Sequence, residues 1–192
     1  MCTSPFVENT RHQYQIGGRS VTLCEYSFTA GTTLPLALQW ILTNSRESTP
    51  PGASIPFLYR EVSLFWRLST RRFIAYTLQR ETMTSYDASI PQGDLIFVAH
   101  THPVPADLPS GMVQWITTMP SPEDTGNMMP NQRYSIVVHR DTRTNQIPHA
   151  FIFSRTGQVH TTRFVRDLAA AARVYIELET AAATRARLVG QY

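Results

Sequence analysis

Apolar residues alternate with polar ones in Val21–Phe28 and form short apolar runs elsewhere in the chain, and both patterns are typical of β-strands. Glycine, proline and small polar residues separate these stretches, which supports reading them as separate strands. The polar tripeptide Ser69-Thr70-Arg71 predicts a tight turn between two of them. The predicted strands are Val21–Phe28, Tyr59–Leu68, Arg72–Leu78, Leu95–His100, Tyr134–Arg140, His149–Ser154 and Gln158–Phe164.

Two other stretches show helical spacing of their apolar residues. The first begins after Thr32 or Thr33, either of which would cap it, and runs to about Thr43, with Pro35 in its first turn. The second is a C-terminal helix within residues 165–189, alanine-rich and running from Asp167 to about Leu188. Strands and helices together predict an α+β or α/β fold, a mixed β-sheet flanked by helices.

The remaining segments are predicted to be loops. Residues 1–20 are polar and form an N-terminal extension, with a turn at Gly17-Gly18. Ser45–Pro56 contains three prolines and a glycine, and Pro103–Pro120 contains four prolines and Ser110-Gly111. Loops as long as the second one are usually functional or mobile in compact domains. With 192 residues, the chain is expected to form a single domain, 1–192.

Composition narrows the class of protein. The hydrophobic content of 42% and the aromatic content of 10% are globular values. No apolar run approaches the roughly 18 residues that span a bilayer, and residues 1–5 lack the layout of a secretory signal. We therefore expect a soluble protein without a membrane span, either cytoplasmic or exported without a cleaved signal peptide. Cys2 and Cys24 are too few for a disulfide framework and are expected to be reduced.

The basic residues are unusual because all 17 are arginine and the chain contains no lysine. A GC-rich genome, which favours arginine codons, is one explanation. The other is avoidance of an ε-amine that enzymes modify, ubiquitin attachment included, which would suit a protein near isopeptide chemistry or one delivered into a eukaryotic cell. The net charge is only +3 and the arginines are dispersed, which argues against a nucleic-acid partner.

The most informative motif is His100-Thr101-His102-Pro103, which closes a predicted strand. Two histidines at i and i+2 project to the same face of a strand. With a carboxylate from a later segment they would form a His/His/Asp set, which suits Zn²⁺ with an open fourth position for water. The sequence therefore predicts a catalytic zinc site.

The carboxylate of that set has two candidates. Asp124, in Ser121-Pro122-Glu123-Asp124, is favoured over Asp107 because it has a nearby serine. The same four residues also form a typical helix start, with Ser121 as N-cap, and the two interpretations are compatible. The other histidines of the later strands are expected to make local hydrogen bonds rather than to bind a second metal. These are His139, His149 and His160.

The pattern Glu … His-x-His-Pro … Ser-x-x-Asp resembles that of the JAMM (MPN+, JAB) metallopeptidase family, and also JAMM-related domains of bacterial polymorphic toxins. The resemblance covers roughly residues 32–164. It implies a JAB/MPN-like, cytidine-deaminase-like fold and a Zn²⁺ cofactor bound by His100, His102 and Asp124. It further implies that Ser121 stabilises the oxyanion, and that a glutamate from an earlier strand is the general base on the zinc-bound water. Relative to the family, Pro103–Pro120 would be an insertion that serves as a lid or a specificity loop, with Met112 and Trp115 as candidate contacts.

Glu61 is the favoured general base. It opens a strand that follows the first helix and precedes one hairpin partner before the histidines, which is the order that the resemblance implies. Glu25 is the main alternative, although it precedes the helix. Glu47 lies in the proline-rich loop, and Glu81 is too close to the next strand to come from a separate one.

The predicted function is that of a zinc-dependent metallopeptidase that hydrolyses a peptide or isopeptide bond. Members of the family that the chain resembles often act next to ubiquitin or ubiquitin-like proteins, so the expected partner is a protein or peptide substrate, including such conjugates. A delivered effector or toxin is one form that this function would take, and a ubiquitin-like-protein protease is another. Two alternatives stay open: a catalytically inactive MPN-type scaffold that binds a partner protein, and a zinc hydrolase of a non-peptide amide.

Overall fold

Strands dominate the part of the chain that the computed structural model describes, which comprises residues 8–16, 18–48, 51–52, 57–59, 61–78, 94–102, 120–126, 128, 133–140, 148–159 and 167–189. The strands are β1 (Glu8–Ile16), β2 (Arg19–Ser27), β3 (Arg46–Ser48), β4 (Phe57–Tyr59), β5 (Ser63–Arg67), β6 (Arg72–Leu78), β7 (Leu95–Thr101), β8 (Tyr134–Arg140) and β9 (Pro148–Ser154). The helices are α1 (Leu34–Asn44), α3 (Pro122–Gly126) and α4 (Leu168–Val189).

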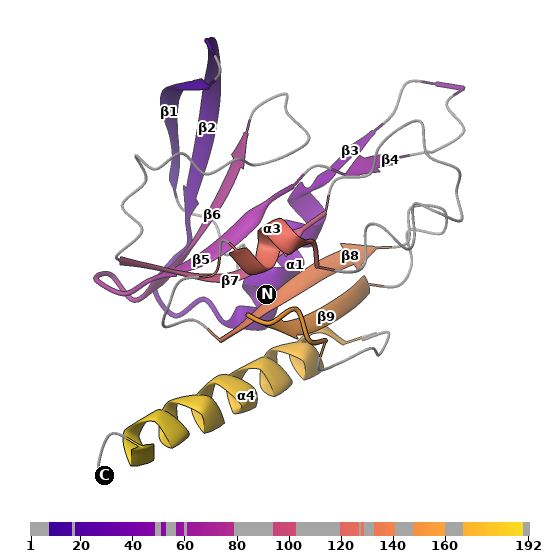
Figure 1. Cartoon of the computed structure of the whole chain (residues 1–192). Coiled ribbons are helices and arrows are strands. Elements are labelled where there is room, and N and C mark those ends of the chain that lie inside the picture. The colour runs from indigo at the N-terminus through magenta and orange to yellow at the C-terminus, as the bar shows by residue number, and fades with distance from the viewer. Residues whose placement is uncertain are drawn as a thin grey trace.

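Seven of these strands form one mixed sheet in the order β1-β2-β6-β5-β7-β8-β9, and β3 pairs with β4 in a separate two-stranded sheet (Figure 1). Neighbours in the large sheet are antiparallel except for β7 and β8, which are parallel. A parallel pair needs a crossover connection rather than a hairpin. In this chain α3 belongs to that crossover, so the connection brings new side chains to the carboxyl end of β7.

Helices α1 and α4 cover one face of the sheet and pack against each other. Thr33 occupies the N-cap position of α1 and Pro35 lies in its first turn, although the Thr33 side chain makes no capping hydrogen bond. Leu38 and Ile41 are fully buried against the sheet. Burying a side chain of this size stabilises the fold by about 1.5–3 kcal/mol. Sheet residues of this face include Leu64, Ala75, Ala99, Ile136, Val138, Ala150 and Ile152, and Val62 just before β5 packs with them.

The opposite face of the sheet carries α3, which Figure 1 shows in front of the strands while α1 lies behind them. Because side chains alternate along a strand, the residues between those of the helix-covered face point to this side. They include a second apolar cluster of Leu23, Phe65, Ile74, Tyr76, Leu95 and Phe97. A third small cluster, of Met128, Val137 and Phe153, lies next to the functional residues described below.

The structure confirms a mixed sheet with flanking helices, and with it the general α+β class. Most predicted strands are present, as are the helix after Thr33 and the long C-terminal helix, α4. One predicted strand is wrong: Tyr59–Leu68 is divided into β4 and β5, because residues 61–62 stand outside both strands. Two segments expected to be irregular contain strands, β1 within residues 1–20 and β3 within residues 45–56.

Several predictions concern residues outside the described part of the chain. These are Cys2, Glu81, the loop residues 103–119 with Asp107, Met112 and Trp115, His160, and the strand expected beyond Val159. Within the described residues, none of the helices combines the length and the apolar character needed to span a bilayer.

Candidate metal centre

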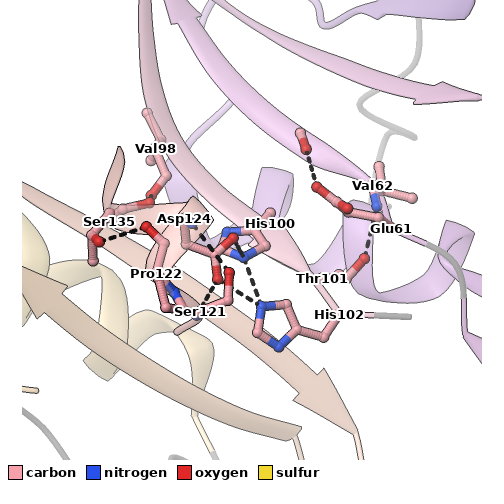
Figure 2. Close-up of polar contacts among 12 residues, drawn as sticks. Glu61, Val62, Val98, His100, Thr101, His102, Ser121, Pro122, Asp124 and Ser135 are labelled. Atoms are coloured by element: carbon pink, nitrogen blue, oxygen red, sulfur yellow. Dashed lines mark hydrogen bonds and ion pairs between the residues drawn. The ribbon is translucent and has the colours of Figure 1, made fainter. Parts of the chain in front are cut away.

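The two histidines of the motif lie at the carboxyl end of β7, on the face that carries α3 (Figure 2). His100 and His102 are two positions apart, so the pleat directs both side chains to the same side of the sheet. Ala99, which alternates with them, points into the opposite core beneath α1 and α4. The two imidazoles therefore lie on the face of β7 that also carries Leu95 and Phe97, away from the core beneath α1 and α4.

Helix α3 brings Asp124 to these histidines. The backbone N–H of Asp124 donates to Ser121 Oγ (3.2 Å), and the backbone N–H of Ser121 donates to Asp124 Oδ2 (2.6 Å). This reciprocal pair is a capping box, with Pro122 in the first helical position. The helix start predicted from the sequence is therefore present, and the same turn orients the Asp124 carboxylate towards β7 (Figure 2).

Three potential metal ligands converge at this point. The Nε2 atoms of His100 and His102 are 2.9 Å apart. His100 Nε2 is 3.0 Å from Asp124 Oδ1, and His102 Nε2 is 3.1 Å from Asp124 Oδ2. Ligands in a tetrahedral zinc site with bonds of 2.0–2.1 Å are about 3.3 Å from one another. The three side chains therefore stand close to the spacing that such an ion requires, and this cluster could hold a metal ion.

Protons alone do not satisfy these contacts. Each Nε2 atom carries at most one hydrogen, and the carboxylate is an acceptor only. If both Nε2 atoms donate to Asp124, two N–H donors face each other across 2.9 Å. If one Nε2 donates to the other, the second imidazole presents a lone pair to a carboxylate oxygen. A cation between the three groups makes all three contacts favourable, so the donor set fits a metal.

Burial and charge in this cluster have opposite effects on the pKa of Asp124. Burial of the Asp124 carboxyl opposes its charged form, but its hydrogen bonds with His100 and His102, and the charges of those residues, outweigh that effect and hold its pKa well below the ordinary value. Asp124 is therefore ionised at neutral pH, as a metal ligand must be. Both histidines are buried, with His100 fully so.

Aromatic packing holds the His100 ring in place. It stacks on Phe97 with ring centroids 5.2 Å apart and meets the edge of Phe153 at 6.3 Å. Among the described residues, His100 Nδ1 has no hydrogen-bond partner. The orientation of this imidazole therefore depends on ring packing, which leaves Nε2 directed at the other two side chains.

The strand register places Glu61 and Glu25, the two main candidates for a general base, at different distances from the histidines. Ser63 of β5 lies opposite His100 of β7, and Val62 bonds with Thr101 in the next position. Continuing this register by one residue places Glu61 opposite His102, on the same face of the sheet and one strand away. Paired Cα atoms in an antiparallel sheet are about 5 Å apart.

Glu25 is on the same face but much farther away. Glu25 lies opposite Tyr76, which in turn lies opposite Ser63, so three strand spacings, about 14 Å, separate Glu25 from His100. Its carboxylate accepts a hydrogen bond from the Tyr76 hydroxyl (3.0 Å) and pairs with His12 and Arg67. Glu25 belongs to this separate polar network. Glu47 lies in β3, in the other sheet.

Ser121 has a hydroxyl group available beside the cluster. Its Oγ accepts the Asp124 N–H, so its own hydrogen is left to donate elsewhere. His139 is buried on β8, opposite His149 of β9. Within the described residues, His100, His102 and Asp124 form the one group of three or more histidine, cysteine and acidic side chains that is close enough to share an ion.

Sequence reasoning missed three hydroxyl-bearing residues around the Glu61 segment, namely Ser63, Thr77 and Thr101. All three are buried, and each bonds to the segment that carries Glu61. The signal that could have indicated them is a polar residue inside an apolar run, because a buried hydroxyl needs a partner.

Comparison of the chain with protein-family models, with curated proteins and with solved structures finds no match. The geometry of the chain's own residues therefore carries the functional argument.

Proposed function

We propose that this protein is a zinc-dependent hydrolase of peptide or isopeptide bonds, of the JAMM type. The observation that carries the proposal is the convergence of His100 Nε2, His102 Nε2 and the Asp124 carboxylate, with donor atoms 2.9–3.1 Å apart. Two imidazoles and one carboxylate are a ligand set typical of catalytic zinc. When bound, zinc would polarise a carbonyl oxygen and lower the pKa of a water molecule towards 7, which makes hydrolysis feasible at neutral pH.

Glu61 has the position of a general base in this proposal. Its carboxylate accepts a hydrogen bond from Ser63, which lies opposite His100, and continuing this register past Val62 puts Glu61 opposite His102. Its carboxylate would accept a proton from the attacking water and return it to the amine that leaves when the amide bond breaks. A side chain that does both must lie within reach of the scissile bond throughout the reaction.

Ser121 would stabilise the oxyanion that forms on the carbonyl oxygen. Its hydroxyl accepts the Asp124 N–H and retains its own hydrogen for donation. A donor aimed at a developing oxyanion lowers the barrier by about 3–4 kcal/mol. The capping box thus gives one turn of chain two roles, since it directs Asp124 to the metal and holds the donor next to it.

Two further features support the family and the substrate class. Apart from the small β3–β4 sheet, the order after α1 is the Glu61 segment, the β5–β6 hairpin, the histidine strand β7 and then α3 with Asp124, which agrees with the order in the JAMM family. The absence of lysine suits a protein that works beside ubiquitin-like conjugation, because the chain offers no ε-amine as an acceptor. A delivered effector that acts on such conjugates accommodates both features.

The test is hydrolysis by the zinc-loaded protein, with Glu61→Gln as the diagnostic variant. The substrates are an isopeptide-linked di-ubiquitin, a ubiquitin-like conjugate, casein and peptidoglycan, assayed in parallel. We expect cleavage of a protein or conjugate substrate and a loss of about 10²–10⁴ in rate in Glu61→Gln, with the zinc content unchanged. Glu25→Gln is the matched control, since this carboxylate shares the face but lies three strands away, and it should keep the activity.

Other results would replace the proposal with one of its alternatives. A native protein that binds no zinc, together with no cleavage of any substrate, would favour a protein-binding scaffold. Cleavage confined to peptidoglycan would favour a hydrolase of a non-peptide amide. Equal activity of Glu61→Gln and the wild-type protein would remove Glu61 from the mechanism.

A further inference from the structure

The segment that carries Glu61 stands just outside the ladder of β5, which begins at Ser63. A residue outside a ladder lacks the regular backbone bonds that hold a strand, so its position must be fixed by other contacts. In the described part of the chain, three buried hydroxyls make such contacts. We infer that Ser63, Thr77 and Thr101 are positioning residues that fix Glu61 beside the metal cluster. This inference rests on the proposed function, because it assigns them to the general base.

Thr101 and Thr77 hold the backbone of the segment from both sides. Thr101, the residue between the two histidines, accepts the Val62 N–H on its Oγ1 (2.9 Å), and its own N–H donates to the Val62 carbonyl (3.0 Å). From β6, Thr77 Oγ1 donates to the Glu61 carbonyl (3.2 Å). The backbone of the Glu61 segment is thereby tied directly to the strand that bears His100 and His102 (Figure 2).

Ser63 holds the side chain. Its hydroxyl donates to Glu61 Oε1 at 3.3 Å, and it lies opposite His100 in the sheet. Ser63 is fully buried between the apolar residues Val62 and Leu64. A hydroxyl at such a position costs free energy unless it is hydrogen-bonded, and this one is bonded to the carboxylate. Ser63 therefore lies opposite His100, contacts the Glu61 carboxylate and restricts where that carboxylate can lie.

Ser135 provides a comparison within the same sheet. It is also a fully buried serine on a strand next to β7, and its hydroxyl donates to the Val98 carbonyl (3.2 Å). Each serine loses one hydrogen bond when it is changed to alanine, but of the two only Ser63 bonds to Glu61. Ser135→Ala is therefore the matched control for Ser63→Ala.

The experiment compares Ser63→Ala, Ser63→Thr and Ser135→Ala in the full-length protein loaded with zinc. We expect Ser63→Ala to keep its zinc, to lose at least about tenfold in kcat and to change KM by less than about twofold, because the base is misplaced but the substrate still binds. Ser63→Thr keeps a hydroxyl and should restore kcat. Ser135→Ala should retain the wild-type kcat. Crystal structures of the zinc-loaded wild type and Ser63→Ala should show the Glu61 carboxylate displaced in the variant.

The results separate this inference from the proposed function. The inference would be overturned if the Glu61 carboxylate did not move in Ser63→Ala, or if Ser63→Ala and Ser135→Ala lost kcat equally. The proposed function would still be supported in that case if Glu61→Gln were inactive. If the wild-type protein hydrolyses no substrate, the proposed function fails, and the two crystal structures still decide whether Ser63 fixes Glu61. Thr101→Val tests the contact to Val62 without an activity assay. It removes the acceptor of the Val62 N–H, so amide hydrogen exchange at Val62 should become faster, whereas Thr101→Ser keeps the acceptor and should leave the exchange rate unchanged.

Discussion

Zinc should stabilise this protein against heat, and the effect should depend on the three converging side chains. The perturbation is Asp124→Asn, which keeps the shape of the side chain and removes its charge. In the folded protein the carboxylate oxygens lie 3.0 Å and 3.1 Å from the two Nε2 atoms, so an ion can bind without a rearrangement of the backbone. Its binding energy then adds directly to the stability of the folded state.

The expected stabilisation by zinc follows from the linkage between ion binding and folding. An ion at 100 times its dissociation constant stabilises the folded state by about 2.7 kcal/mol. For a domain of 150–250 residues, each kcal/mol raises Tm by roughly 2–4 °C, so the wild-type protein should gain about 5–11 °C. In Asp124→Asn one of three ligands has lost its charge, and the gain should fall to a small fraction of this value at the same zinc concentration.

The assay is differential scanning calorimetry of chelator-treated protein, with and without zinc, together with zinc analysis of the dialysed samples. The measured quantity is the difference between the two Tm values of each variant, because the substitution also changes the stability of the metal-free protein. His12→Ala is the control, since His12 is on β1 and pairs with Glu25, far across the sheet, and it should keep the full gain. An equal gain in Asp124→Asn and the wild type would refute the assignment of Asp124 as a ligand.

Three further predictions concern single residues. Ser121→Ala should lower kcat by about 10²–10³, which steady-state kinetics would show. It should also lower the free energy of unfolding by about 1 kcal/mol through the lost helix cap, which denaturant unfolding would show, while Ser121→Thr should keep the cap. Leu38 lies on the buried side of α1, and Leu38→Ala should lower the free energy of unfolding by about 2–5 kcal/mol in denaturant unfolding. It should leave the zinc stoichiometry unchanged, because the metal cluster is on the opposite face of the sheet. Burial raises the pKa of Glu179 above its ordinary value of 4.5, despite the hydrogen bond that its carboxylate accepts from the Tyr134 N–H. The wild-type protein should therefore lose stability as the pH rises from 4.5 through the raised pKa, because the folded state binds this proton more tightly than the unfolded state does. Glu179→Gln should therefore gain Tm relative to the wild type between pH 4 and pH 7, and a flat difference across this range would contradict the burial argument.

Much of the secondary structure could be predicted because local patterns determine it. Strands β5 to β9 have alternating or continuous apolar residues, and α1 has a helical repeat with a proline in its first turn. Strand β1 was missed because its sequence, Glu8–Ile16, is polar on both faces. Such a strand exists through its backbone pairing with β2 along its whole length, and pairing between distant segments leaves no periodic signal.

The cluster that could hold an ion was predictable because two of its three members form a short motif whose spacing matches the pleat of a strand. The order of elements along the chain already favoured Glu61 over Glu25, but the three strand spacings between Glu25 and the histidines follow from the sheet order, which the sequence does not give. The sequence can mark Ser63, Thr77 and Thr101 as buried hydroxyls that need partners, but it does not say which partners they have. Their contacts with the Glu61 segment depend on the register between β5 and its neighbours, which is a tertiary property.

The position of Asp124, 22 residues beyond His102 in the sequence, follows from the topology. Because β7 and β8 are parallel, the chain must return along the sheet by a crossover of a dozen residues or more. The crossover starts at the carboxyl end of β7, where the imidazoles are. A helix start within it can therefore bring an acidic side chain to them, whatever the length of the connection before it. Closing a longer loop costs only about 0.6 kcal/mol for each doubling of its length. A long insertion between His102 and Ser121 is thus compatible with a closed ligand set, provided that the capping turn of α3 still lies over the end of β7.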